Sequence, residues 1–255
     1  MLHYADRQAE LVRVRIDRQM IFDRTRRNLV AATLILLGGL LFAGVLYAHG
    51  VEKGDADFLE RNAGQALLAF MYLGAKHMIT GYDHLLYLLG VIFFLYRPRD
   101  IAVYVTLFAA GHSITLLTGV LGGINVNAYL VDAVIGLSVA YKAFENLDGF
   151  KRVFDWQPDP RIAVFLFGLV HGFGLATKLQ DLTLAREGLV ANIISFNVGV
   201  EIGQLLALVV LLVLINAWRA AGSFERHANA FNLLLMFAGF ALAAYQIAGF
   251  YFGPA

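Results

Sequence analysis

The sequence predicts an all-α integral membrane protein with seven transmembrane helices, of which the second is broken. Of its 255 residues, 59% are hydrophobic and only 15% are charged, whereas a soluble domain has about 45–50% apolar and about 25% charged residues. A soluble globule of this length has too little interior to bury so many apolar side chains. Seven apolar segments have roughly the 20 residues that a helix needs to cross the hydrocarbon core. Lipid must therefore be part of the solvent of this chain.

The seven segments follow one another without room for a soluble domain. They are Leu29–Ala48, Ala66–Tyr96, Ile101–Leu121, Tyr129–Asn146, Ile162–Thr177, Leu189–Ala217 and Phe231–Tyr251. We expect residues 1–28 to form a basic cytoplasmic segment and residues 29–255 to form the transmembrane domain. The first apolar segment is longer than the 7–15 residues or so of a signal-peptide core, so we predict that it is retained as a span.

The second segment, Ala66–Tyr96, is too long for one straight crossing. Its middle contains Gly81 and Asp83; both residue types are poor in a helix interior, and Asp is a good N-cap. We therefore predict non-helical backbone over residues 80–82 and a new helix that begins at Asp83. Irregular backbone at membrane depth survives only inside protein or against water, and in transporters such breaks mark binding sites.

Basic residues outside the spans predict the orientation, because cytoplasmic loops carry an excess of Lys and Arg. With a cytoplasmic N-terminus, fourteen of them fall inside and four outside. Those inside are Arg7, Arg13, Arg15, Arg18, Arg24, Arg26, Arg27, Arg97, Arg99, Lys151, Arg152, Arg161, Arg219 and Arg226, and those outside are Lys53, Arg61, Lys178 and Arg186. We expect a multi-pass protein of a bacterial-type inner membrane, with its C-terminus on the periplasmic or extracellular side.

Composition narrows the possible partners. The chain has no cysteine, so thiolate metal sites, disulfides and cysteine nucleophiles are excluded. A net charge of +1 predicts no nucleic-acid partner. The expected partners are membrane lipid and a divalent metal ion as substrate, and the sequence does not indicate an oligomeric state.

Ionisable residues inside apolar spans are functional candidates, because each costs about 2.5–3.5 kcal/mol on insertion scales. Four spans carry them at similar depth. The candidates are His77, Asp83 and His84 in the second span, His112 in the third, His171 in the fifth and Glu201 in the sixth. Imidazole and carboxylate groups suit divalent first-row metals. We predict that these side chains converge on one intramembrane site for nickel, cobalt or zinc.

Such a site supports two classes of function, so whether the protein is an enzyme stays open at this stage. A permease would strip the ion of water and pass it across the membrane. An intramembrane zinc-dependent hydrolase would hold Zn²⁺ on His84, His112 and His171, with Glu201 or Asp83 as the general base. A haem or quinone scaffold that uses two histidines is a third possibility, but it gives the two carboxylates no role.

Several motifs resemble one family when read together. They are HMITGYDH at residues 77–84, GHSIT at 111–115, HGFGLA at 171–176 and FNVGVEIGQ at 196–204. In this order they resemble the HupE/UreJ family, over roughly residues 66–217. The stretch from Asp132 to Ser138, followed by Glu145 and Asn146, is also similar to that family. The resemblance implies a membrane permease for nickel, of the kind linked to hydrogenase and urease maturation, and it favours transport of nickel or cobalt over hydrolysis.

Overall fold

The computed structural model describes residues 66–180 and 188–253, and within them every regular element is a helix. The helices in chain order are α3 (Leu67–Thr80), α4 (Tyr82–Ile92), α5 (Pro98–Gly122), α6 (Ala128–Asn146), α7 (Gly149–Phe154), α8 (Pro160–Gln180), α9 (Leu189–Ala220) and α10 (Phe224–Phe252). The predicted cytoplasmic segment 1–28 and the first predicted span, Leu29–Ala48, lie outside the described residues.

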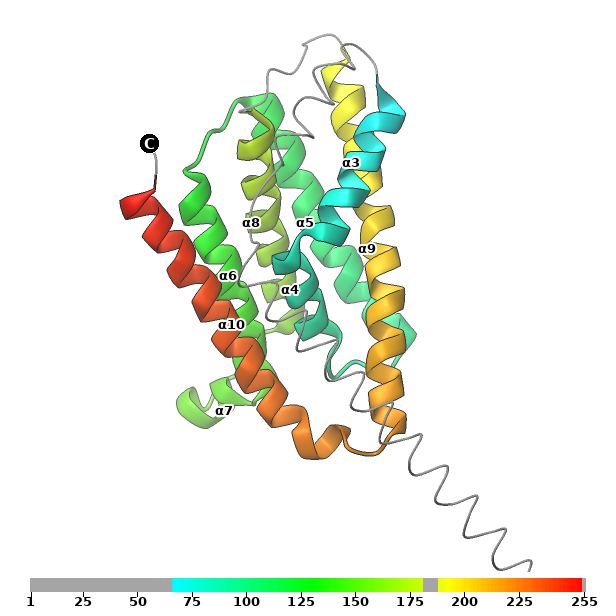
Figure 1. The fold of residues 1–255 in the computed structure, drawn as a ribbon, viewed down its shortest axis with the longest axis vertical. Coiled ribbons are helices and arrows are strands. Elements are labelled where there is room, and N and C mark those ends of the chain that lie inside the picture. Colours follow the sequence, from blue (N-terminus) through cyan, green and yellow to red (C-terminus); the bar gives the residue numbers. More distant parts are fainter. Residues whose placement is uncertain (1–65, 181–187, 254–255) are drawn as a thin grey trace, which may run out of the picture.

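Three close helix pairs form the bundle: α3 with α9, α5 with α8, and α6 with α10 (Figure 1). Glycines permit the close approach. A Cβ added to Gly199 of α9 would overlap the Met71 carbonyl of α3, and one added to Gly168 of α8 would overlap the Phe108 carbonyl of α5. Small residues at helix interfaces are typical of membrane proteins, where packing rather than the hydrophobic effect holds helices together.

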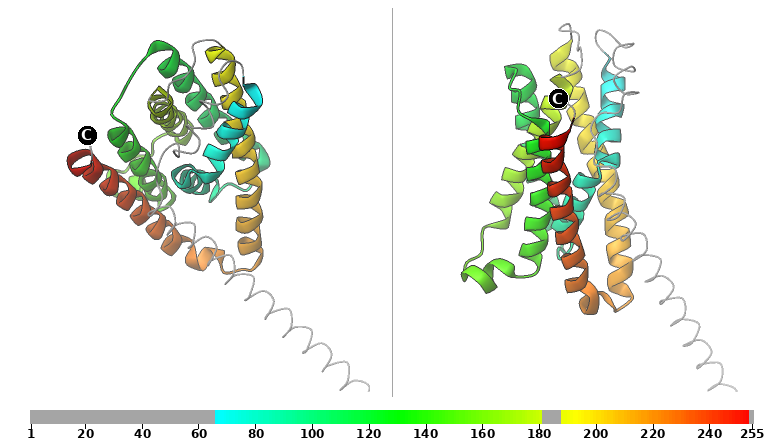
Figure 2. Two further views of the ribbon diagram at one scale, coloured as in Figure 1. Left: turned by 45° about the horizontal axis from the view of Figure 1, so that its top comes forward. Right: turned by 60° about the vertical axis from the view of Figure 1, so that its left-hand side comes forward.

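The short helix α4 lies between these pairs and contacts α3, α5, α6, α9 and α10. Its residues from His84 through Ile92 are all buried, as its central place in Figure 1 suggests. Its far end is held by Arg219 of α9, whose guanidinium donates to the Phe93 carbonyl at 2.6 Å. We call this end of the bundle, where α4 ends and α7 lies, the α7 face. Figure 2 shows α9 continuing past α3 to this face.

The predicted break in the second span is confirmed. α3 ends at Thr80 and α4 begins at Tyr82, with Gly81 in an extended conformation between them. The Gly81 N–H still donates to the His77 carbonyl at 2.8 Å. At least one backbone hydrogen bond of the last turn of α3 is therefore kept at the bend. The helix start differs by one residue from the prediction: Gly81 is the N-cap, and Asp83 lies within the first turn.

The all-helical prediction is confirmed, whereas seven spans are not. Among the described residues, α5, α8, α9 and α10 are long and apolar enough to cross a membrane, and α4 is a shorter apolar helix. Helix α6 has the length of a span but carries Asp132, Lys142 and Glu145. Helix α7, which the sequence did not predict, lies between α6 and α8.

Candidate metal site

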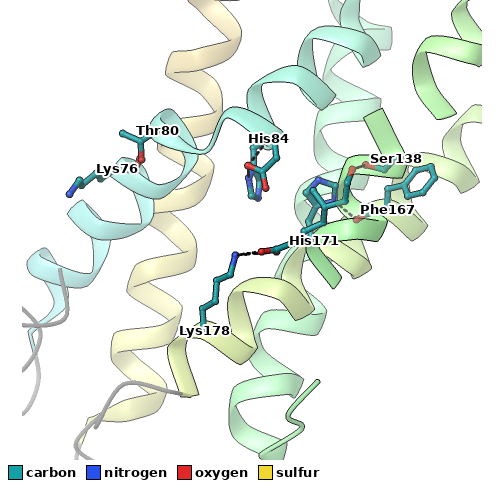
Figure 3. Close-up of polar contacts among 10 residues, drawn as sticks. Lys76, Thr80, His84, Ser138, Phe167, His171 and Lys178 are labelled. Carbon is teal, nitrogen blue, oxygen red and sulfur yellow. Dashed lines mark hydrogen bonds and ion pairs between the residues drawn. The ribbon is translucent and has the colours of Figure 1, made fainter. Parts of the chain in front are cut away.

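Four histidines from four helices gather around the start of α4. The ring of His84 is the centre of the group. Its centroid lies 4.9 Å from that of His77 on α3, 5.0 Å from that of His171 on α8 and 6.2 Å from that of His112 on α5. His84, His112 and His171 are at most 3% exposed. Figure 3 shows His84 and His171 side by side, below the break in the chain.

The local sequence explains this convergence. His77 is in the last turn of α3, and His84 follows the break, so the bend at Gly81 brings the two rings together. A Cβ at Gly81 would come within 2.9 Å of His84 Nδ1, so a residue larger than glycine at this position would displace the His84 ring. Gly172 allows α8 to approach α5 at the same level, because a Cβ there would overlap the His112 carbonyl.

Hydrogen bonds orient two of the rings. His84 Nδ1 lies 2.9 Å from Asp83 Oδ1, and His171 Nδ1 lies 2.7 Å from the Phe167 carbonyl oxygen. Each oxygen is an acceptor, so Nδ1 carries the proton and Nε2 keeps its lone pair. Metal-binding histidines are commonly oriented in this way, by a carboxylate or a backbone carbonyl on the nitrogen that does not bind the metal.

The remaining nitrogens are buried without a partner in the described part of the chain. They are Nε2 of His77, His84 and His171, and both ring nitrogens of His112. Buried polar atoms are normally satisfied, and each unsatisfied one costs about 1–3 kcal/mol. One nitrogen of each neutral imidazole carries the proton, so His112 can supply a lone pair from only one of its two nitrogens. At most four of these five nitrogens, one per ring, are therefore able to donate a lone pair to a cation.

The cluster is not yet a formed metal site. Across residues 66–180 and 188–253, no three His, Asp or Glu side chains converge closely enough to hold an ion as they stand. The spacing of the rings is nevertheless suitable: with metal–nitrogen bonds of about 2.1 Å, two imidazoles on one tetrahedral ion have centres about 5 Å apart. Coordination would require the imidazole rings to turn so that their unpartnered nitrogens face one ion.

A partly buried ion pair lies on the side of the cluster away from the α7 face. Lys178 Nζ of α8 is 2.7 Å and 3.0 Å from the two carboxylate oxygens of Asp132 on α6. Figure 3 shows the Lys178 side chain below His84 and His171, with a dashed line from its amino group to the carboxylate. The pair places a cation and an anion beside the histidines, within electrostatic range of Asp83 and His77.

The structure brings together five of the six predicted site residues: His77, Asp83, His84, His112 and His171. Glu201 is the exception, because it lies on the exposed face of α9. Asn197 and Gln204 are four residues before and three residues after Glu201, about one turn away on either side, and both turn toward the bundle. At 3.6 residues per turn they are rotated about 40° and about 60° from Glu201 in the same direction. Asn197 donates to Ser113 of α5 at 2.6 Å, and Gln204 is 2% exposed.

Sequence reasoning missed two residues beside the cluster. Lys178 was expected in an outer loop, but α8 extends to Gln180 and includes it. The spacing could have indicated this, since Lys178 is seven residues, or two turns, after His171. Tyr87 is one turn after His84, and its ring packs 5.3 Å from that of His171. An apolar helix rich in aromatic residues gave no reason to single it out.

Fold and cluster define a class of protein: an all-helical, multi-pass membrane protein with imidazole groups gathered inside the bundle. The comparison with family models identifies a specific family within this class. The family model described as HupE / UreJ protein matches residues 53–253, which is most of the chain, so the protein belongs to this family. No curated protein and no solved structure matches the chain. Membership implies a membrane transporter of a metal such as nickel or cobalt, and it does not support the hydrolase alternative.

Proposed function

We propose that this protein carries a divalent first-row metal ion, Ni²⁺ or Co²⁺, across the membrane through the histidine cluster. The observation that carries the proposal is the set of unpartnered, buried imidazole nitrogens around His84, two of whose rings are oriented for binding through Nε2. Imidazole nitrogen suits these metals. A site of neutral rings releases the ion more readily than a cage of charged ligands does, as transport requires.

The proposed topology has seven spans, with the first at Leu29–Ala48 and the second formed by α3 and α4 together. The N-terminus is cytoplasmic and the C-terminus lies outside, which makes the α7 face cytoplasmic. Support comes from the distribution of Lys and Arg: Arg97, Arg99 and Lys151 all lie at the α7 face. The ion then enters past Asp132 and Lys178 and leaves toward α7, and a membrane potential that is negative inside favours this direction.

Glu201 is not part of the proposed site, and its exposure also weakens the hydrolase reading. A hydrolase needs three histidines that hold zinc and a base that faces the bound water. Here Glu201 lies outside the cluster, and Asp83 already accepts a hydrogen bond from His84. Asp132 is paired with Lys178, so among residues 66–180 and 188–253 the cluster offers imidazole ligands for an ion but no unpaired carboxylate that could act as a base.

Proteoliposomes test the proposal. Purified protein is reconstituted with a membrane potential, and uptake of Ni²⁺ and Co²⁺ is measured together with equilibrium binding in detergent. We expect His84→Ala and His171→Ala to lose both binding and uptake. His227→Ala is a matched control, because His227 is in the first turn of α10, outside the cluster, where its Nδ1 lies 2.9 Å from the Ser223 carbonyl oxygen. Wild-type protein that binds neither ion, or a His84→Ala variant that transports normally, would sink the proposal.

A further inference from the structure

The ion pair of Lys178 and Asp132 is more accessible than the histidines beside it. Asp132 is in the second turn of α6 and Lys178 is in the last turn of α8, so the pair lies near the end of the bundle opposite the α7 face. The side chains are 21% exposed for Lys178 and 12% exposed for Asp132. Ionisable groups near the ends of spans reach the aqueous interface. The pair therefore stands between the water at this end and the enclosed cluster.

The pair is also close enough to influence the cluster. Lys178 is two turns after His171, so the two side chains share a face of α8. Side chains of a helix lean toward its N-terminus, which directs the ammonium back toward the histidines. Figure 3 shows Lys178 below His84 and His171. The ammonium and the Asp132 carboxylate are both within electrostatic range of Asp83. A cation bound at Asp132 would therefore be a direct neighbour of the histidine site.

The backbone around Lys178 is anchored, so the side chain is the part that can move. Gln180 Nε2 donates to the Ile124 carbonyl at 3.0 Å, and the Val126 N–H donates to the Thr177 hydroxyl at 3.4 Å. These bonds hold the end of α8 to the segment between α5 and α6. A lysine ammonium is a compact charge on a flexible four-carbon stem. The ammonium can leave the carboxylate without any movement of the helices.

The ammonium occupies the carboxylate as a bound cation would. It donates to both Asp132 oxygens, at 2.7 Å and 3.0 Å, and such charge-assisted bonds are strong. Because the ammonium is attached to the protein, its effective concentration at the carboxylate is about millimolar or higher. A free monovalent cation carries the same charge and gains no Coulomb energy over the ammonium. A divalent cation at the same distance doubles the attraction, so it competes far better.

We propose that Lys178 is a tethered competitor of the transported ion, which occupies the Asp132 carboxylate, gives it up to a divalent cation and excludes Na⁺ and K⁺ from the entry side of the cluster. This inference rests on the proposed transport function and identifies a residue that determines ion selectivity. When a divalent ion binds Asp132, repulsion between like charges moves the ammonium into the water at the helix end. Specific sites often contain an element that acts against the wrong ligand in this way.

Lys178→Met tests the proposal, because it removes the charge and keeps the apolar stem. Ni²⁺ uptake into proteoliposomes is measured in two media of equal ionic strength, one with Na⁺ and one with the bulky cation N-methylglucamine, so that screening is the same. We expect the wild-type KM for Ni²⁺ to agree within about twofold between the media. For Lys178→Met we expect a KM at least about threefold below wild type in the bulky cation, and at least about threefold higher again in Na⁺.

Three further variants serve as controls. Lys178→Arg keeps the positive charge and both hydrogen bonds to the carboxylate, so it should keep the selectivity of wild type. Asp132→Asn, added to Lys178→Met, removes the carboxylate and should abolish the sensitivity to Na⁺. Lys151→Met removes a lysine at the α7 face whose ion pair is 62% exposed on each side, and it should transport like wild type. If Lys178→Met does not fold, Lys178→Gln replaces it, since its amide is neutral and still forms hydrogen bonds.

The results separate this inference from the proposed function. Wild-type protein that neither binds nor transports Ni²⁺ overturns both. If wild type transports and Lys178→Met keeps the wild-type KM in both media, the tethered competitor is wrong while transport stands. Inhibition of wild-type uptake by Na⁺ also overturns it. So does a loss of folded protein or of maximal rate in the neutral variants without a change in KM or in sodium sensitivity, because that pattern describes an ion pair that only holds α6 against α8.

Discussion

Asp83→Asn is the substitution that most directly tests how the histidine cluster binds metal. The Asp83 carboxylate accepts the His84 Nδ1–H at 2.9 Å, and the two side chains are 21% and 4% exposed. Asparagine has the same shape but no charge, so it no longer favours one ring tautomer or raises the basicity of Nε2. Loss of such an orienting partner costs about 10–100-fold in metal affinity, or about 1.4–2.7 kcal/mol.

The assay is calorimetric titration of purified protein with Ni²⁺. We expect a dissociation constant about 10–100-fold higher for Asp83→Asn, and a larger loss for His84→Ala, which removes the donor atom itself. Asp148→Asn is the control, since its pair with Lys151 is 62% exposed on each side and such pairs contribute little. An Asp83→Asn affinity within about twofold of wild type would refute the reasoning that the carboxylate prepares His84 for metal.

Three further predictions concern other parts of the molecule. Gly199→Ala should lower the free energy of unfolding by about 1–3 kcal/mol, because its Cβ meets the Met71 carbonyl; melting of this variant is compared with that of Gly122→Ala, where the nearest atom is 3.4 Å away. Glu201→Gln should leave Ni²⁺ affinity within about twofold of wild type in the same titration, because the side chain is exposed outside the cluster. A loss of affinity of about tenfold would show instead that Glu201 contributes to the metal site. A reporter fused after the last residue should be active outside the cytoplasm, and cytoplasmic activity would reverse the proposed topology.

Sequence reasoning was strong where the signal is local. The break at Gly81 could be predicted from residues next to one another in the sequence, since a glycine and an acid interrupt an apolar segment that is too long for one crossing. Most ends of the long helices were also predicted to within about three residues; α9, for example, begins at Leu189 as expected. The exception is α10, which begins at Phe224 and not at the predicted Phe231. Length and hydropathy are properties of the segment itself, so they do not depend on which helices later become neighbours.

The cluster could be predicted in part, because depth in the membrane is also a local property. Histidines on the second, third and fifth predicted spans lie at similar depth, and burial of their polar rings favours a shared site. This argument selected His77, His84, His112 and His171, which the structure brings together. It selected Glu201 as well, because depth says nothing about the direction in which a helix turns its side chains.

By itself, then, the sequence determined the helical membrane class, the break and the level at which the histidines lie. Only the tertiary structure decided which faces of the helices meet. The rotation of α9 about its axis depends on the glycines that pack against α3, and it turns Gln204 inward and Glu201 outward. The pairing of Lys178 with Asp132, 46 residues apart, likewise exists only because α6 and α8 lie side by side. Helix rotation and pairing come from many weak contacts between distant segments, and no single stretch of sequence contains them.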